Sequence, residues 1–367
     1  MKAISVQTLQ EGTLYSTPLY ADGAVFLPAN VALTHKDIAM LHKIGVNEVF
    51  TDGRPLTVEA GKTEAETESE LEKTRIFARM IDVIRIVDKV FKAVAASVPV
   101  KPRIMWTVIA QLMQMINENR AACVEFILGN KISTYDLAKS AINTAILTAI
   151  IALELKVPEQ MLPELVSAAV LHDVGMLRIP RAVLDKHTPL TAEEKLVIQR
   201  HAILSFQIVQ DEMRYPQTVA QAVLQHHERW DGLGYPQRFS GTDIDKFASI
   251  IAVADSFEAM VCTKPYRNSI TAYKAMKTML SENSSHFSPR VLRAFVKMMG
   301  IYPVGSGVVL NNGLRAKVQA NNHDAPLRPV LTVIADAAGK KVAFGEQVDL
   351  LTNKTLYITT TFDPHSI

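Results

Sequence analysis

The chain has 367 residues, of which 48% are hydrophobic and 21% charged, and its formal net charge is +2 at pH 7. This length suffices for two or three domains, and the near-neutral balance argues against a disordered chain or a protein that coats nucleic acid. Cys123 and Cys262, the only cysteines, form no spaced motif. A disulfide framework or cysteine-based zinc site is therefore excluded, which fits a reducing cytoplasm.

The first 60 residues alternate short apolar runs with turn signals at Asp22-Gly23 and Asp52-Gly53. Helical spacing of apolar residues runs from Thr34 to Ile44. Residues 1–60 are therefore predicted to form a small α+β module. The start lacks a basic region followed by an apolar run, so a signal peptide is not expected there.

Residues 61–130 are predicted to be a helical connecting segment. The stretch 59–75 is rich in Glu, Lys and Thr, which suits a solvated connection or the exposed start of a helix. Helices are then expected over 76–95 and 104–119, where apolar residues recur at helical spacing.

Residues 131–300 are predicted to be a bundle of helices, at 132–155, 163–173, 192–213, 217–229 and 244–262, with two more ending near Met299. Thr191 with Glu194 forms a capping box, and Ser288-Pro289 is a cap followed by a first-turn proline. The apolar stretch 141–155 is interrupted by polar residues, so it is expected to be buried rather than to span a membrane.

After Tyr302-Pro303 the composition changes to glycine-rich turns and β-branched runs. Residues 301–367 are therefore predicted to be a small antiparallel β domain. The predicted fold class is mainly α, a helical bundle with a small N-terminal α+β module and a small C-terminal β domain.

Two short motifs carry the candidate chemistry: His172-Asp173 in HDVGM, and His226-His227 in HHERWDGLGYP. Imidazole and carboxylate are the two ligand types that together hold divalent first-row metals. Helical spacing places His201 within an apolar stripe, so this side chain is expected to point inward.

The same spacing puts His226 and His227 on an apolar helix face, and Asp255 in the middle of another buried face. An unpaired buried carboxylate costs several kcal/mol or neutralises itself. A metal would satisfy Asp255, Asp173 and the inward histidines together. The alternative is an ion pair between Asp255 and a His or Arg inside the bundle.

With these residues in place, residues from about 130 to 300 resemble the HD-GYP subgroup of the HD metal-dependent phosphohydrolases, named for a His-Asp dyad and a Gly-Tyr-Pro loop. LHDVG, Ile179-Pro180, His201, HHERWDGLGYP, AVADSFEAM and KPYR occur in the family's order. The resemblance implies an HD-type helical bundle. It implies catalytic roles for His172 and Asp173, and metal ligation by His172, Asp173, His201, His226, His227 and Asp255, with Asp173 bridging two ions.

Family members typically hydrolyse the bacterial second messenger cyclic di-GMP, so the resemblance implies hydrolysis to pGpG and further to GMP. It implies two or three divalent ions, most often iron or manganese. Two such ions can clamp a phosphodiester and lower the pKa of a bridging water, which supplies a hydroxide for attack on phosphorus.

Lys264 and Arg267, in KPYR, resemble the basic residues of the family's ligand pocket. The alternative is that they form a solvated basic turn. Tyr235 and Pro236 belong to a rigid loop that is expected to line the substrate cleft or to dock a partner. The resemblance implies a GGDEF-domain protein as that partner. A homodimer is a further expectation, whereas a nucleic-acid polymer and a membrane are not expected.

The chain departs from the family pattern at two positions. Met176 stands where the HDxGK motif has a lysine, and Arg178 is the nearest residue that would compensate. Ser140 stands where family members carry a histidine upstream of the dyad. Asp136, one turn earlier on the same face, would contribute to a metal directly or through water.

The residues and the resemblance leave three functions open. The first is an active cyclic di-GMP phosphodiesterase. The second is a catalytically impaired protein that binds cyclic di-GMP or a protein partner. The third is an HD hydrolase of another nucleotide, against which the Gly-Tyr-Pro loop argues.

Overall fold

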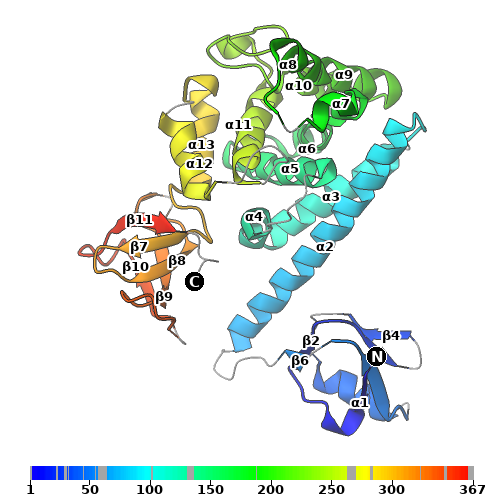
Figure 1. The fold of residues 1–367 in the computed structure, drawn as a ribbon, viewed down its shortest axis with the longest axis vertical. Coiled ribbons are helices and arrows are strands. Elements are labelled where there is room, and N and C mark those ends of the chain that lie inside the picture. Colours follow the sequence, from blue (N-terminus) through cyan, green and yellow to red (C-terminus); the bar gives the residue numbers. More distant parts are fainter. Residues whose placement is uncertain are drawn as a thin grey trace. The chain divides into compact units, whose positions relative to one another are not determined.

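The computed structural model describes residues 2–362, apart from 22–23, 29–30, 32, 44, 54, 57–63, 101, 130–135, 187, 263–269, 282–283, 323 and 343–344. The chain forms two compact units, Met1–Arg79 and Met80–Ile367. Figure 1 shows the first in blue, with strands and a short helix, and the second from cyan to red.

The N-terminal unit is built on an antiparallel sheet in the order β1 (Lys2–Ser5), β5 (Glu48–Thr51), β3 (Leu19–Ala21) and β4 (Ala24–Leu27). It also holds η1 (Val6–Thr8), α1 (His35–Lys43) and the strand pair β2 (Leu14–Tyr15) and β6 (Pro55–Leu56). Along β5 Val49 and Thr51 are buried while Glu48 and Phe50 are exposed, because successive strand residues point to opposite faces. The predicted α+β structure of the N-terminal part is confirmed, and its end at residue 60 stays a prediction.

The second unit is mainly helical, as predicted. Its helices are α2 (Glu64–Ala95, which begins before the unit boundary), α3 (Pro102–Glu118), α4 (Arg120–Gly129), α5 (Leu137–Glu154), α6 (Leu162–Leu171), α7 (Arg181–Leu184), α8 (Ala192–Gln199), α9 (His201–Gln207), α10 (Gln217–Gln225), α11 (Lys246–Val261), α12 (Ala272–Ser281) and α13 (Pro289–Met299). Short helical turns connect them: η2 (Glu159–Met161), η3 (Val174–Arg178), η4 (Ile208–Glu212, a π-turn), η5 (Gly241–Asp243) and η6 (Ser284–His286).

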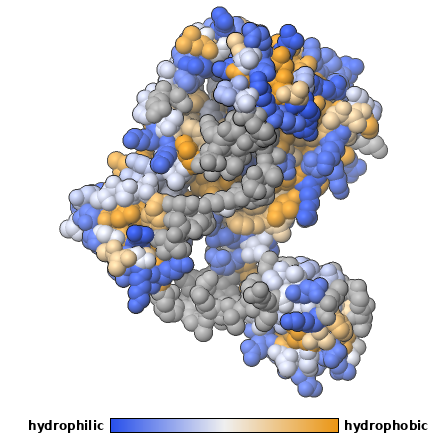
Figure 2. Space-filling view, in the orientation of Figure 1, coloured by the Kyte–Doolittle hydropathy of each residue, from blue (hydrophilic) through white to orange (hydrophobic). Residues whose placement is uncertain are grey.

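Helix α5 is the centre of this bundle and packs against α6, α11 and α13. Every residue from Ala138 to Ala152 is buried, as expected for a helix that is apolar all round. Its length and composition would also allow it to cross a membrane, but 83% of it is buried inside the protein. Helix α5 is therefore a core helix, as predicted. On the surface visible in Figure 2, hydrophilic and hydrophobic residues are interspersed.

The C-terminal strands form one antiparallel sheet in the order β10 (Gln347–Asp349), β9 (Val330–Ala335), β8 (Arg315–Ala320), β7 (Gly307–Leu310) and β11 (Ile358–Phe362). Leu331, Val333 and Ala335 of β9 point alternately into its core. The ring of Tyr302 stacks on that of Tyr273 from α12, with centroids 5.0 Å apart. The predicted antiparallel β structure of the C-terminal segment is confirmed, and its bounds as a separate domain stay a prediction.

The helix prediction was wrong in detail at four places. Helices α4 and α7 were not expected. The helix predicted over 192–213 is divided into α8, α9 and the π-turn η4. The helix predicted over 217–229 ends at Gln225, where the Glu228 N–H donates to the Gln225 carbonyl in a tight turn. The two adjacent histidines therefore lie just beyond the helix rather than along its face.

Candidate metal centre

Three buried histidines share one local arrangement. His172 lies at the C-terminal end of α6, His201 begins α9, and His226 lies at the C-terminal end of α10. In each, ring atom Nδ1 lies 2.6–2.7 Å from the backbone carbonyl oxygen three residues earlier. A carbonyl oxygen only accepts, so Nδ1 carries a proton, and in the neutral imidazole Nε2 keeps a lone pair. This is how proteins orient metal-binding histidines.

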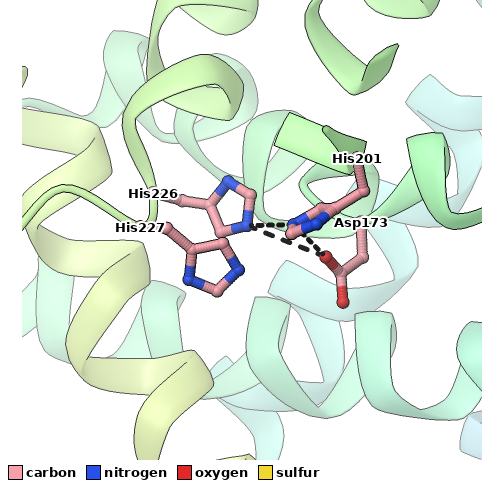
Figure 3. A group of neighbouring side chains, drawn as sticks. All are labelled: Asp173, His201, His226 and His227. Atoms are coloured by element: carbon pink, nitrogen blue, oxygen red, sulfur yellow. Dashed lines mark hydrogen bonds and ion pairs between the residues drawn. The ribbon is translucent and has the colours of Figure 1, made fainter. Parts of the chain in front are cut away.

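The Nε2 atoms of His201 and His226 converge on Asp173, as Figure 3 shows. Asp173 Oδ1 lies 3.1 Å from His201 Nε2 and 3.7 Å from His226 Nε2. The two imidazole Nε2 atoms lie 3.3 Å apart. With His227, one ligand atom from each of these four residues lies within 4.8 Å of the others. Lone pairs and carboxylate oxygens that face one another are suited to a cation.

His172 and Asp255 form the other half of the site. His172 Nε2 lies 3.5 Å from Asp255 Oδ1 and 3.6 Å from Asp173 Oδ2. This Nε2 atom is buried and makes no hydrogen bond among the described residues. The two oxygens of Asp173 thus face two groups of candidate ligands.

The residues therefore fit divalent metal ions. Buried polar atoms in folded proteins are normally hydrogen-bonded, and His172 Nε2 is an exception that a metal would explain. The side chains of Asp173 and Asp255 are 18% and 16% exposed, whereas that of His172 is 1% exposed. The carboxylates are accordingly more accessible to solvent than the His172 ring.

Comparison with known proteins agrees with this geometry. A family model described as "HD domain" matches residues 109–291, and one described as "KOW domain associated with HD domain" matches residues 307–367. The chain is 34% identical over 210 residues to the cyclic di-GMP phosphodiesterase PA4108 of Pseudomonas aeruginosa, covering 57% of this chain and 50% of that protein. It is 38% identical over 149 residues to a cyclic di-GMP phosphodiesterase of Thermotoga maritima, covering 40% of each.

Among solved structures, Bd1817, an HDG"Y"P protein from Bdellovibrio bacteriovorus, matches with a TM-score of 0.52 at 16% sequence identity, covering 80% of this chain and 97% of that chain. The chain belongs to the HD-GYP family. Its HD-GYP fold is thereby confirmed, and the HD domain implies divalent metal binding. The chain spans only 40–50% of the length of these two curated relatives.

The Gly-Tyr-Pro loop of this HD-GYP protein packs directly on the histidine pair. The Tyr235 N–H donates to the His227 carbonyl over 3.2 Å, and the two rings lie with centroids 4.7 Å apart. Gly234 lies against the backbone of residues 227–229, so close that a Cβ there would meet the Arg229 nitrogen at 2.3 Å. The glycine is therefore required by close backbone approach.

Glu228 and Gly175 lie next to the candidate ligands in the sequence and were not predicted to contribute to the site. Glu228 is 3% exposed, and its Oε1 accepts the N–H groups of Gln237 and Arg238, which holds the far end of the HD-GYP loop. Gly175 donates its N–H to the buried Ser205 hydroxyl over 2.7 Å, which ties the dyad turn to α9. The only available signals were an acid beside the histidine pair and a glycine beside the dyad.

Charge and burial set the protonation of the ligands. Burial alone would lower the pKa of His172, but the negative charges of Asp173 and Asp255 raise it to about 9. Burial would raise the pKa of Asp173, but His172 and His201 hold it well below its usual range. Burial and the neighbouring imidazoles lower the pKa of His227.

Some predicted site residues do not join the metal cluster. Arg178 pairs with Glu212 at 3.1 Å and donates to the Val94 carbonyl, so its charge is engaged away from the dyad. Lys264 and Arg267 lie outside the described residues. Met176 is half-buried in η3, and Pro236 follows Tyr235 in the HD-GYP loop.

Ser140 and Asp136 are likewise engaged by the protein. The Ser140 hydroxyl donates to Glu258 Oε2 over 2.8 Å, beside Asn143, which donates to Glu258 Oε1 over 3.2 Å. Asp136 caps α5 by accepting the N–H groups of Ala138 and Lys139. Both side chains thus have structural roles at the start of α5.

Proposed function

We propose that this chain is a metal-dependent phosphodiesterase that hydrolyses cyclic di-GMP to pGpG and further to GMP. The observation that carries the proposal is the convergence of three Nε2 lone pairs, each fixed by an Nδ1 hydrogen bond, with Asp173 and Asp255. The names of the relatives support the substrate class.

We propose that two ions, iron or manganese, are held by the six residues His172, Asp173, His201, His226, His227 and Asp255. We propose two ions rather than three, because the Ser140 hydroxyl is directed to Glu258 and Asp136 caps α5. Bound there, the ions would polarise the phosphodiester and acidify a water molecule.

The chain's own residues orient and shield this chemistry. Asp173 presents one oxygen to each ligand group. Burial raises the pKa of Tyr235, so its hydroxyl stays protonated at neutral pH and can donate to a phosphate oxygen. His227, braced by Tyr235, stays neutral and available as a ligand. Lys264 and Arg267 are proposed to contact the phosphates or a guanine edge.

The test is turnover of cyclic di-GMP by the full chain, loaded anaerobically with iron(II) or with manganese(II), with products separated by chromatography. His226→Ala should abolish hydrolysis. His42→Ala, at an exposed histidine of α1 in the other unit, should leave it unchanged. Absence of hydrolysis with both metals would overturn the proposal.

A second function, binding without turnover, is favoured by Met176 and Ser140. Met176 offers no charge to a phosphate where the family motif has lysine. If the chain binds cyclic di-GMP without cutting it, and Met176→Lys with Ser140→His restores hydrolysis, the impaired module is the correct function. A substrate panel with adenine-containing cyclic dinucleotides distinguishes the remaining alternative, hydrolysis of another nucleotide.

The proposed setting is the cytoplasm, which fits the two free cysteines. The HD-GYP loop is proposed to dock a GGDEF-domain protein. Leu233 at this loop is 73% exposed, and an apolar side chain so placed suits a partner surface. A homodimer is the corresponding proposal for assembly, checked by sedimentation.

A further inference from the structure

A separate cavity of about 420 Å³ lies among α5, α11, α13 and the base of the HD-GYP loop. Its volume is in the usual range for small-molecule sites. The residues that line it include both ends of the loop segment, Trp230 and Gly241. The remaining wall is mainly apolar and includes Val157, Pro158, Phe247, Ile250 and Val291. None of the six proposed metal ligands lines it.

Three cations also line this cavity: Lys156 after α5, Lys246 at the start of α11, and Arg290 in the first turn of α13. All three are exposed, and within the described part of the chain none forms an ion pair with a carboxylate. The nearest acid in sequence, Asp245, accepts the N–H groups of Phe247 and Ala248 at the start of α11. The residues that line the cavity therefore include three cations and no carboxylate.

The start of α13 adds a second kind of anion recognition. Ser288 is only 9% exposed and lines the cavity, yet its hydroxyl makes no capping hydrogen bond and has no other partner among the described residues. The first-turn N–H groups of α13 consequently lack a side-chain acceptor. An anion at a helix N-terminus satisfies such groups.

We infer that this cavity binds a small amphipathic anion, a carboxylate or phosphate joined to an apolar body. The anionic group lies between Ser288, Arg290 and Lys246, and the body packs against Trp230 and Phe247. The Gly241 N–H donates to the Trp230 carbonyl over 3.0 Å, and the backbone N–H of Trp230 donates to the His286 carbonyl over 2.8 Å. The bound molecule thus contacts both ends of the segment that contains Gly-Tyr-Pro.

The experiment uses the full chain with Trp106→Phe, which leaves Trp230 as the only tryptophan. Its fluorescence is titrated with octanoate, octyl phosphate and neutral 1-octanol. We expect a saturable blue shift with at least one anion, with an affinity about tenfold or more above that for 1-octanol. The two anions distinguish a carboxylate from a phosphate ligand. A matched pair of variants locates the site: Arg290→Ala should weaken anion binding at least about fivefold, whereas Arg293→Ala, on the same helix but not lining this cavity, should not.

Absence of a saturable shift would overturn the inference, as would equal affinity for 1-octanol. An equal loss of affinity in the Arg290 and Arg293 variants would also overturn it, since the binding would then be non-specific attraction to α13. None of these outcomes depends on hydrolysis, so failure here is distinguishable from failure of the proposed function.

Discussion

Replacing Gly234 with alanine tests whether the HD-GYP loop braces the metal centre. An added Cβ would meet three backbone atoms: the Arg229 nitrogen at 2.3 Å, the Glu228 Cα at 2.6 Å and the His227 oxygen at 2.6 Å. None of these atoms can rotate away as a side chain would. The loop or the histidine turn must therefore move, and overpacking of this kind costs about 1–3 kcal/mol.

For a domain of this size, about 1 kcal/mol shifts Tm by roughly 2–4 °C, so a cost of about 1–3 kcal/mol should lower the Tm of Gly234→Ala by roughly 2–12 °C. Because the displaced turn carries His227, manganese content after dialysis should fall as well. The assays are thermal unfolding and elemental analysis of the same sample. Gly129→Ala is the control, since a Cβ there meets nothing within 4 Å. If the two variants had the same Tm and manganese content, the loop would not brace the site.

Three further outcomes follow from the site. Ser205→Ala removes the acceptor of the Gly175 N–H, so it should lower the free energy of unfolding by about 1–3 kcal/mol, measured by urea titration; no change would mean that another acceptor replaces the hydroxyl. His172 has a pKa of about 9 in the metal-free fold, against an ordinary value of 6.5, so its contribution to stability is present below pH 6.5 and is lost as the pH rises through 9. A metal ligand must be deprotonated, so manganese affinity should rise as the pH approaches 9. Below that pH, manganese binding should release about one proton from His172. Calorimetry in two buffers should find a smaller release for His172→Asn. Removal of bound metal by a chelator should lower Tm, because a ligand at 100 times its Kd stabilises the fold by about 2.7 kcal/mol. In His226→Ala the chelator should lower Tm much less.

Much of the fold could be predicted because the strongest signals are local. The buried α5 follows from an apolar run, and the start of α8 follows from Thr191 and Glu194, whose reciprocal capping box is present. The end of α10 could not be predicted, because its apolar spacing continues through the histidine pair. Nδ1 of His226 instead donates to the Val223 carbonyl. This hydrogen bond depends on three-dimensional geometry that periodicity does not encode.

The site follows the same division. Ligand types and the inward position of His201 could be predicted from spacing, since they depend on residues one or two turns apart. The engagement of Arg178 by Glu212 and of Ser140 by Glu258 joins residues 34 and 118 positions apart. Such pairs depend on how helices pack, so a motif comparison assigns these side chains to the site without showing that the protein already uses them elsewhere.

The histidine pair and the Gly-Tyr-Pro loop are close in the sequence and are also joined by direct contacts in the fold. Tyr235 bonds to the His227 carbonyl, Gly234 lies on the backbone of residues 227–229, and Glu228 accepts the two N–H groups that follow Pro236. The loop and the histidine pair therefore act as one structural unit. Residues that share a network give non-additive effects. Gly234→Ala combined with Glu228→Gln should consequently cost less stability than the sum of the two single changes, because either one alone already frees the loop from the histidine turn.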